Sequence, residues 1–413
     1  MPEELFVKEL ANGMTLLGQR MQHVASAAMT IAAPAGAAHD PPDSAGAASV
    51  ISQWLLRGAG GRDTRGLNDA LDALGCQHHE SVLSEHLQLG AAQLGRNLAD
   101  VLAIYADILR RPGLEDATFE PARALIAQDL ASLEDEPARK SALMLRQRFY
   151  PHPLGRCVYG TADSLASMTA DGVRGHVAEV LAPQGVILSV AGRIDWEAFC
   201  DLAEGHFSDW AGDGGAPVAT EAPSGGVTHI EKDSAQVHIT LAHKAACVRD
   251  PRYYAIRIAE AVLSGGMSSR LFTEVREKRG LVYHVSARYH SLKDHAGMFT
   301  YAGTVREKAQ ETFDVTVGEL RRLQEGIEKS ELARAKTQLK SSLVMQGEST
   351  AARANALAAD WYHLGRLRSL KQISRAVDAV TADDVLEYLG EYPAENFTVL
   401  VIGPELPDTG AIE

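Results

Sequence analysis

The sequence has 413 residues, which is too many for one hydrophobic core and suits two domains of about 200 residues each. Hydrophobic residues make up 46% and charged residues 23%, as in an ordinary globular protein, and no apolar run is long enough to span a membrane. The 40 Lys and Arg against 54 Asp and Glu leave a net charge of −14, which argues against nucleic acid or an anionic membrane as the main partner.

The N-terminus and the cysteines indicate the compartment. The first residues, Met-Pro-Glu-Glu-Leu-Phe, lack the basic-then-apolar pattern of a secretion signal. The four cysteines are scattered, with no pair at metal-ligand spacing: Cys76, Cys157, Cys200 and Cys247. Disulfides stay open at this point, but a reducing compartment is the simpler interpretation. We therefore predict a cytoplasmic protein.

The first half of the chain alternates between strand patterns and helix patterns. Strands are predicted at 5–10, 14–21 and 25–33, with Asn12-Gly13 as a hairpin turn. A helix follows from Asp43 or Ser44 to Leu56 and is stopped by Gly58. The remaining predicted elements are a helix at 64–74, strands at 76–83 and 86–94, helices at 96–110, 116–135, 138–149 and 170–181, and a strand at 186–190.

Residues 211–226, rich in Gly, Pro, Ala and Ser, are predicted to link two domains, 1–210 and 227–413. Fragments of the first half recur in the second at shifts of 210 to 212 residues. The pairs are Leu109-Arg110-Arg111 with Leu320-Arg321-Arg322, Ala122-Arg123 with Ala333-Arg334, Leu154-Gly155-Arg156 with Leu364-Gly365-Arg366, and Thr169-Ala170-Asp171 with Thr381-Ala382-Asp383. Four matches in one register favour a duplicated domain over chance.

The stretch 264–289 predicts a short helix, a tight reversal and a strand. Gly265 and Gly266 break the preceding pattern, and Ser268 or Ser269 is a candidate helix cap. Leu271, Phe272 and Val275 share one helical face, which is therefore predicted to be buried. Gly280 supplies a left-handed stop. From 282 onward the period is two, with Tyr283, Val285, Ala287 and Tyr289 on one side and Val282, His284, Ser286 and Arg288 on the other.

This geometry places Arg276, at the helix end, within reach of Tyr283, at the strand start. A guanidinium and a phenol together offer donors suited to a carbonyl or carboxylate of a bound chain. The structural alternative is an arginine that caps its own helix and a tyrosine that packs on a sheet.

The segment 265–285 resembles the C-terminal-domain motif of the pitrilysin-like metallopeptidase family, which includes insulinase and mitochondrial processing peptidase. In that family an arginine and a tyrosine at this spacing contact the substrate beside a zinc ion carried by another domain, and they match Arg276 and Tyr283. The resemblance implies an α/β (α+β) fold of two duplicated domains, each a mainly antiparallel sheet covered by helices. It also implies that the chain forms half of a clam-like peptidase chamber.

The metal motif of active family members is eroded in this chain. Those members carry His-x-x-Glu-His on the first helix and a third, glutamate ligand some 75 residues later. The matching helix here has Ser49 and Gln53 at the histidine positions and Ser52 at the glutamate position, and Asp129 follows 76 residues after Gln53. The helix ends and the loop 152–156 anchor this register. We therefore predict that this chain binds no zinc and has no catalytic residue of its own.

Two further groups of histidines are candidate metal ligands. His78, His79, Glu80, Glu85 and His86 cluster in the sequence. Solvated or channel-lining residues are the preferred interpretation, because the resemblance places them on strands along the substrate channel. His238 and His243 are interpreted as surface or core residues, and no phosphate-binding Gly-x-x-x-x-Gly-Lys motif is present.

The predicted function is a non-catalytic, substrate-binding subunit of a heterodimeric zinc metalloendopeptidase that cleaves peptides or unfolded protein segments. A homologous partner chain would carry the zinc. The alternative from another class is a structural or assembly subunit, like the family's respiratory-complex core proteins, without proteolysis. An enzyme with an unrecognised site of its own is the third possibility. The identity of the substrate and of the partner lies outside the sequence.

Overall fold

In the computed structural model, which describes residues 3–412, the strands form two large sheets, each in its own unit of the chain. Unit 1 comprises the residues up to Ser132, Arg156–Thr220 and Gln346–Ser369. Unit 2 comprises Leu133–Gly155, Glu221–Met345 and the residues from Leu370 onward. Within the described residues, no helix is both long and apolar enough to cross a membrane.

The sheet of unit 1 has the strand order β1-β2-β8-β3-β7-β6. Its strands are β1 (Glu4–Glu9), β2 (Thr15–Arg20), β3 (Ser26–Ala33), β6 (Gln77–Val82), β7 (Leu87–Leu94) and β8 (Ile187–Gly192). All neighbours are antiparallel except β2 and β8, which are parallel. β6 therefore forms one edge, where a further strand could pair with its free backbone groups.

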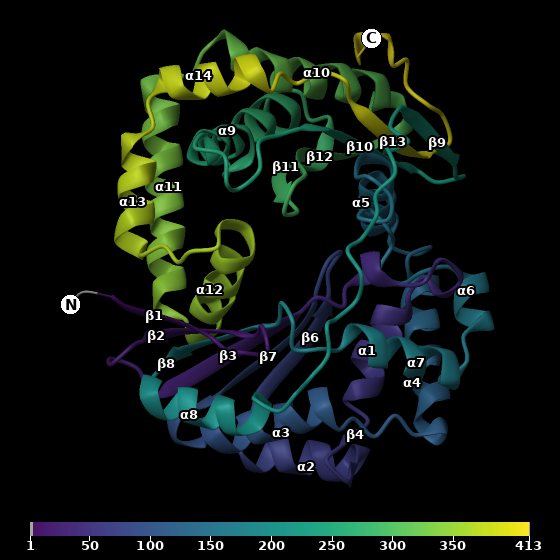
Figure 1. Ribbon diagram of the computed structural model, residues 1–413. Coiled ribbons are helices and arrows are strands. Elements are labelled where there is room, and N and C mark those ends of the chain that lie inside the picture. The colour runs from purple at the N-terminus through teal and green to yellow at the C-terminus, as the bar shows by residue number, and fades with distance from the viewer. Residues whose placement is uncertain (1–2, 413) are drawn as a thin grey trace. The chain divides into compact units, whose positions relative to one another are not determined.

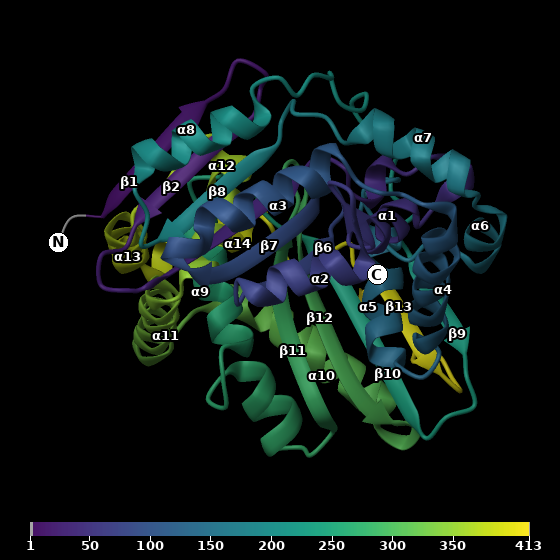
Figure 2. The ribbon, with the colours of Figure 1, turned by 90° about the horizontal axis from the view of Figure 1, so that it is seen from below.

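One face of this sheet packs against helices through large apolar side chains. The helices of this part are α1 (Ala47–Leu55), α2 (Thr64–Ala73), α3 (Leu98–Arg110), α4 (Asp116–Ser132), α6 (Ala162–Ser167), α7 (Ala170–Val180) and α8 (Trp196–Phe207), with a small hairpin of β4 (Gly58–Ala59) and β5 (Arg62–Asp63). Figure 2 shows α3 and α8 side by side over the sheet. Trp54, Tyr105 and Phe199 are almost fully buried in this core, and their removal from water drives the packing.

Helix α12 (Thr350–Leu364) lies on the other face of the unit 1 sheet, and its register is fixed by polar contacts. Thr30 Oγ1 donates to Asn355 Oδ1 at 2.8 Å, and Ser189 Oγ donates to the Ala354 carbonyl at 2.8 Å. The buried Arg353 donates to Gln19 Oε1 at 2.7 Å. Because buried polar groups need partners, these bonds hold α12 in one position on the strands.

The sheet of unit 2 has the order β11-β12-β10-β13-β9. Its strands are β9 (Val227–Glu231), β10 (Gln236–Lys244), β11 (Val282–Ser291), β12 (Ala296–Val305) and β13 (Thr398–Gly403). The pairs are antiparallel except β9 with β13, which is parallel. The unit 1 strands in the order β6-β7-β3-β8-β2 correspond one by one to β11-β12-β10-β13-β9 of unit 2. In both sheets the first three neighbouring pairs are antiparallel and the last pair is parallel, which confirms the predicted duplication.

One face of the unit 2 sheet contributes to an apolar core that also includes Ile256, Val275 and Phe313. The helices of this unit are α5 (Pro137–Phe149), α9 (Tyr253–Ser264), η4 (Phe272–Glu277), α10 (Ala309–Arg322), α11 (Lys329–Glu348), α13 (Leu370–Ala379) and α14 (Ala382–Glu391), with the end of α11 beyond Met345 assigned to unit 1. Figure 1 shows α5 beside β10 and β13, and its Leu145 packs with Ala242 and Leu400 on the opposite face.

The repeated fragments occupy equivalent places in the two units. Thr169 and Thr381 are the N-caps of α7 and α14, and the side-chain oxygen of each accepts a hydrogen bond from a backbone N–H in the first turn of its helix. The repeats at 154–156 and 364–366 follow α5 and α12. Each of these two helices belongs to the unit of the other half of the chain. Helix α5 precedes the predicted linker 211–226 but belongs to unit 2, and α12 follows the linker but belongs to unit 1.

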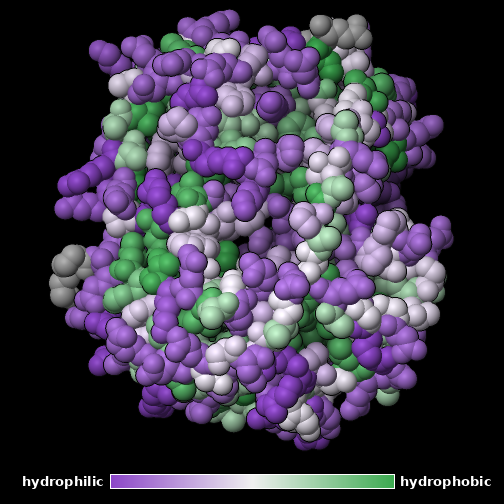
Figure 3. Space-filling view, in the orientation of Figure 1, coloured by the Kyte–Doolittle hydropathy of each residue, from purple (hydrophilic) through white to green (hydrophobic). Residues whose placement is uncertain are grey.

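The predicted domain limits of 1–210, 211–226 and 227–413 stay a prediction about the duplicated halves, and the compact units run across them. Part of the linker is held by backbone bonds: Glu221 N donates to the His152 carbonyl at 2.8 Å, and Gly225 N to the Arg148 carbonyl at 3.0 Å. The face seen in Figure 3 is predominantly polar, with apolar residues in smaller groups, as expected when the cores lie inside the units.

Candidate functional site

The helix that carries Arg276 is a π-helix over Phe272–Glu277 rather than the predicted α-helix. Lys278 N donates to the Thr273 carbonyl at 2.9 Å, five residues back. The predicted stop is confirmed, since Gly280 has φ 59° and its N–H reaches the Arg276 carbonyl at 3.0 Å. Such wide turns are frequent at functional sites, because they rotate side chains off the ordinary helical positions.

Strand β11 begins with a β-bulge at Tyr283. Val282 pairs with Thr304 and His284 with Gly303, so two residues of β11 advance the register by one on β12. The predicted alternation is therefore wrong at this point. Val282 faces the core together with Val285, and both Tyr283 and His284 are exposed. A bulge re-aims side chains in this way without ending the strand.

The bulge and the π-helix bring Arg276 between two aromatic rings. Its guanidinium carbon lies 4.9 Å from the ring centroid of Phe272 and 5.4 Å from that of Tyr283. Tyr283 is 86% exposed and does not pack on the sheet. Phe272, predicted to be buried with Leu271 and Val275, is only half-buried, and it serves as the second platform for the guanidinium. The sequence signal that could have predicted this contact is the position of Phe272 four residues before Arg276.

The acidic residue nearest Arg276 in the sequence, Glu274, is paired with two other cations. Glu274 accepts from Lys278 at 2.7 Å and from Arg279 at 2.9 Å, and these two cations lower the pKa of its carboxyl. Within residues 3–412 neither a hydrogen bond nor an ion pair reaches the Arg276 guanidinium, which also does not cap its own helix. Its N–H donors are therefore available to a bound carbonyl or carboxylate.

The eroded metal positions on α1 have other roles. Ser49 and Ser52 are buried, and their hydroxyls donate to the Val158 carbonyl at 2.6 Å and the Ser49 carbonyl at 2.8 Å. Gln53 donates its amide to Glu80 Oε1 on β6 at 2.9 Å. Asp129 lies on α4, half-buried, and its backbone carbonyl accepts from Ser132 at 2.8 Å. Ser49 and Gln53 therefore hold α1 against its neighbours, whereas the Ser52 hydroxyl bonds within the helix.

The start of α1 differs from the prediction, because neither Asp43 nor Ser44 is its cap. The helix begins at Ala47, and the Asp40 carboxyl accepts from Gly46 N at 2.7 Å and Ala48 N at 2.8 Å. Burial raises the pKa of Asp40 to about 7, although these two N–H groups favour the carboxylate. The cap comes from a residue further upstream than the local pattern suggests.

The donor set on α1 does not fit catalytic zinc. That ion requires about three His, Cys or carboxylate ligands and an open position. Two hydroxyls that donate to carbonyls and an amide that donates to Glu80 supply none of these, and Asp129 is one carboxylate. Over the described part of the chain, no group of three or more His, Cys, Asp or Glu is arranged to hold a metal ion.

Several of the histidines that were candidate metal ligands have structural contacts or are buried. The His79 ring covers Gly90 of β7, where a Cβ would lie 2.1 Å from it. Tyr362 of α12 donates to Glu85, and its ring meets His86 edge-on at 4.6 Å. His238 and His243 are both buried, which agrees with their interpretation as surface or core residues.

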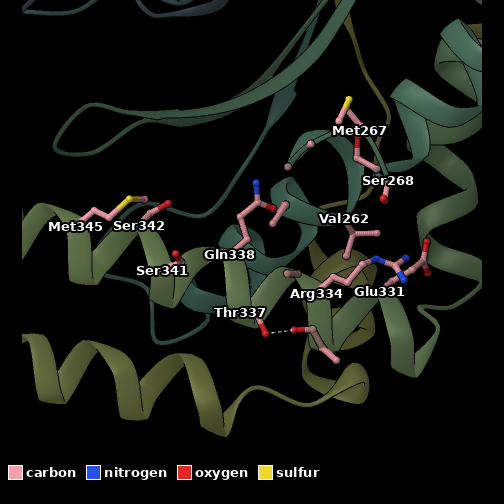
Figure 4. Close-up of a pocket in the computed structure, with 16 residues that line it drawn as sticks. Val262, Met267, Ser268, Glu331, Arg334, Thr337, Gln338, Ser341, Ser342 and Met345 are labelled. Atoms are coloured by element: carbon pink, nitrogen blue, oxygen red, sulfur yellow. Dashed lines mark hydrogen bonds between the residues drawn. The ribbon is translucent and has the colours of Figure 1, made fainter.

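A cavity of ≈ 710 Å³ lies in unit 2 beside the loop that precedes the π-helix. It is lined by α11, by the end of α9 and by the loop Gly265–Ser269, and Figure 4 shows Gln338, Ser341 and Ser342 along α11. Glu331 in its wall is held by Arg270, with two contacts of 2.7 Å. Apart from Glu331 and Arg334, the lining residues are uncharged.

Two family models match most of the chain. The model of insulinase (peptidase family M16) matches residues 15–162, and the model of the peptidase M16 inactive domain matches residues 167–339. The chain belongs to peptidase family M16, the pitrilysin-like family predicted from the motif, and its α1 lacks the His-x-x-Glu-His sequence.

Several bacterial relatives match nearly the whole chain. An uncharacterized zinc protease of Rickettsia bellii is 26% identical over 98% of both chains, and one of Bacillus subtilis is 28% identical over 95% of this chain and 97% of the relative. Among solved structures, the peptidase M16 inactive domain from Pseudomonas fluorescens has a TM-score of 0.89 at 21% identity, covering 98% of this chain and 99% of that one. A protease from Helicobacter pylori has a TM-score of 0.86 at 17% identity, covering 97% and 100%. These structures establish the fold.

Proposed function

We propose that this chain is the non-catalytic, substrate-binding subunit of a heterodimeric zinc metalloendopeptidase acting on peptides or unfolded protein segments. The observation that carries the proposal is Arg276: its guanidinium lies over two aromatic rings and has no hydrogen-bond or ion-pair partner among residues 3–412, whereas Ser49 and Gln53 of α1 are engaged in structural hydrogen bonds. The homologous partner chain would supply the zinc ion and the general base.

In this proposal the substrate binds in extended form at a sheet edge, where backbone hydrogen bonds give affinity with loose sequence preference. Arg276 and Tyr283 then donate to a carbonyl or carboxylate of the peptide and fix its position. Because the guanidinium is already held between Phe272 and Tyr283, little side-chain freedom is lost when the peptide binds. The chain's own contribution is therefore orientation of the peptide.

The test is co-expression with a family M16 chain that carries His-x-x-Glu-His, followed by peptide cleavage assays. We expect the pair to cleave, and each chain alone to be inactive or nearly so. Arg276→Ala or Tyr283→Ala in the pair should lower kcat/KM by about tenfold or more, the loss of one charge-assisted contact. Arg279→Ala is the matched control, since that cation is on the same segment but paired with Glu274.

Other outcomes would replace the proposal. Unchanged cleavage when this chain is omitted, or with both variants, would remove it. A stable complex with a non-peptidase partner and no proteolysis would favour the structural or assembly role. Stoichiometric zinc in this chain alone would point to an enzyme with its own site. We also propose the cytoplasm as the compartment, because scattered thiols suit a reducing environment.

A further inference from the structure

Four neighbouring elements of unit 2 contain no acidic residue. Neither Asp nor Glu occurs in α5, β10, β11 or β12, although the chain has 54 of them and a net charge of −14. The same elements contain the cations Arg139, Lys140, Arg146, Arg148, Lys244 and Arg288. Arg139 and Lys140 are paired with Glu136 and Glu134 outside α5, so the positive potential of this region comes from the other four cations.

The strand register brings part of this charge onto one sheet face. Residues directly opposite in antiparallel strands point to the same side, and Arg288 of β11 is opposite Phe299 of β12. Arg146, from α5, lies over the same ring, with its guanidinium carbon 5.9 Å from the centroid of Phe299. Two arginines therefore approach Phe299 from two different elements.

Neither of these arginines has an anionic partner. Both are exposed, and across residues 3–412 neither a hydrogen bond nor an ion pair reaches the Arg288 or Arg146 guanidinium. Other exposed arginines of unit 2 do have such partners, as Arg249 has Asp294 and Arg306 has Glu405. Like charges without a counter-charge are unfavourable, so a bound carboxylate would be stabilised here.

Polar donors continue this face toward the Arg276 site. Tyr301 lies across Gly303, where a Cβ would be 2.7 Å from the tyrosine hydroxyl, and it shares a hydrogen bond of 2.8 Å with His238 Nδ1. The exposed His284, next to Tyr283 in the bulge, lies 5.8 Å from the Tyr301 ring. We name the set Arg146, His284, Arg288, Phe299 and Tyr301 the cationic face.

We propose that the cationic face binds the acidic side chains of an extended peptide, so that the preferred substrates are segments containing Asp and Glu. That the bound peptide is a substrate rests on the proposed function. Binding of the peptide to the cationic face needs no partner chain. We favour a peptide over a nucleic acid as the ligand, because only two unpaired arginines lie on the cationic face, beside a tyrosine and a histidine. The chain also has a net charge of −14, which disfavours nucleic acid.

The test measures binding by the full chain alone, by fluorescence anisotropy. The probes are three peptides of one length with blocked termini and a neutral fluorophore, containing Glu, Gln or Lys at the same positions. We expect the Glu peptide to bind about tenfold tighter than the Gln peptide, the Lys peptide to bind weakest, and the preference to shrink with added salt. Equal binding of all three peptides would overturn the proposal.

Variants locate the preference. Arg288→Gln and Arg146→Gln should each weaken binding of the Glu peptide by about fivefold, equivalent to about 1 kcal/mol for a partly exposed ion pair. Binding of the Gln peptide should hardly change. Arg306→Gln, with the same loss of charge in the same unit, is the control, and circular dichroism checks folding. Unchanged Glu-peptide affinity in both variants, or an equal loss in the control, would contradict the assignment.

Two further outcomes separate this inference from the proposed function. If the co-expressed pair cleaves Glu and Gln peptides equally well, the substrate class is wrong and the subunit role stands. If the chain binds the Glu peptide through Arg288 but forms no active pair, the subunit role fails and the binding site stands. A single-stranded oligonucleotide that displaces the Glu peptide at lower concentration than unlabelled Glu peptide would assign the face to nucleic acid and overturn the proposal.

Discussion

At the scale of single residues, the proposed function depends on which cations are already paired. Glu274 accounts for Lys278 and Arg279, and Arg276 is left with two aromatic rings and free donors. A planar guanidinium can lie over aromatic rings and still offer the N–H groups along its edge to a ligand. The arrangement therefore depends on the shape of the side chain as well as on its charge.

Arg276→Lys tests that dependence on shape. An ammonium keeps the charge but does not stack or offer a planar set of donors, so we expect kcat/KM of the co-expressed pair to fall by about tenfold. Tyr283→Phe keeps the ring and loses the hydroxyl. If Tyr283→Phe retains most of the activity, the ring of Tyr283 acts only as a platform for Arg276. If the activity of Tyr283→Phe falls as far as that of Tyr283→Ala, the hydroxyl contacts the peptide. Full activity of Arg276→Lys would show that charge alone is sufficient.

The sequence predicted the proximity of Arg276 and Tyr283, because a helix end, a left-handed glycine and a strand start leave few geometries. It did not predict the bulge, because the bulge arises from the pairing of Val282 and His284 with Thr304 and Gly303 of β12, which lie 304 − 282 = 22 and 303 − 284 = 19 residues further along the chain. The half-buried state of Phe272 was missed for a related reason. The 3.6-residue period that assigned it to the core does not apply in a π-helix.

At the scale of elements, the Arg276 segment is fixed at its start by a buried ion pair. Arg270 is 8% exposed, and its Nε and one terminal N–H group each contact Glu331 of α11 at 2.7 Å. A further N–H donates to the Gly326 carbonyl at 2.6 Å, and the pKa of Glu331 is lowered by Arg270. The pair thus joins the π-helix to α11 beside the cavity of Figure 4.

Glu331→Gln is expected to destabilise unit 2 by about 3 kcal/mol, because it leaves the Arg270 charge buried without a counter-charge. Urea unfolding followed by far-ultraviolet circular dichroism measures the loss, and hydrogen exchange over β11 shows whether it is local. Arg334→Gln, an exposed change on the same helix, is the control and should alter stability little. Equal stabilities of the two variants would show that the pair is not an anchor.

His243 of β10 predicts a pH dependence of stability. It is fully buried against Phe397, its Nδ1 has no hydrogen-bond partner among the described residues, and burial lowers its pKa to about 4. The unfolded chain binds the proton near pH 6.5, so stability is fully present above that pH and is lost as the pH falls toward 4. Between pH 7.5 and pH 5 this residue should account for about 2 kcal/mol.

His243→Leu is the corresponding experiment. Whatever its effect at pH 7.5, the variant should lose less stability than the wild type when the pH is lowered to 5, as measured by urea unfolding at both values. The same slope in both proteins would mean that another group titrates. A wild type that is equally stable at both pH values would contradict the burial argument directly.

At the scale of the whole molecule, the sequence predicted the family, the duplication and the sheet-and-helix fold, because repeated fragments and end signals are local. Thr169 and Thr381, for example, cap equivalent helices. The exchange of α5 and α12 between the units was not predicted. An amphipathic pattern shows which face of a helix is buried, but it does not show which of two similar sheets buries it.

The most direct test of the account is a titration of this chain into a fixed amount of the zinc-bearing partner, with peptide hydrolysis as the readout. We predict that the rate rises and saturates at one chain per partner. The Arg276→Ala chain should saturate at the same ratio with a plateau at least about tenfold lower. A rate that does not depend on the added chain, or equal plateaus for the two chains, would contradict the claim that this protein positions a peptide for a metal it does not hold.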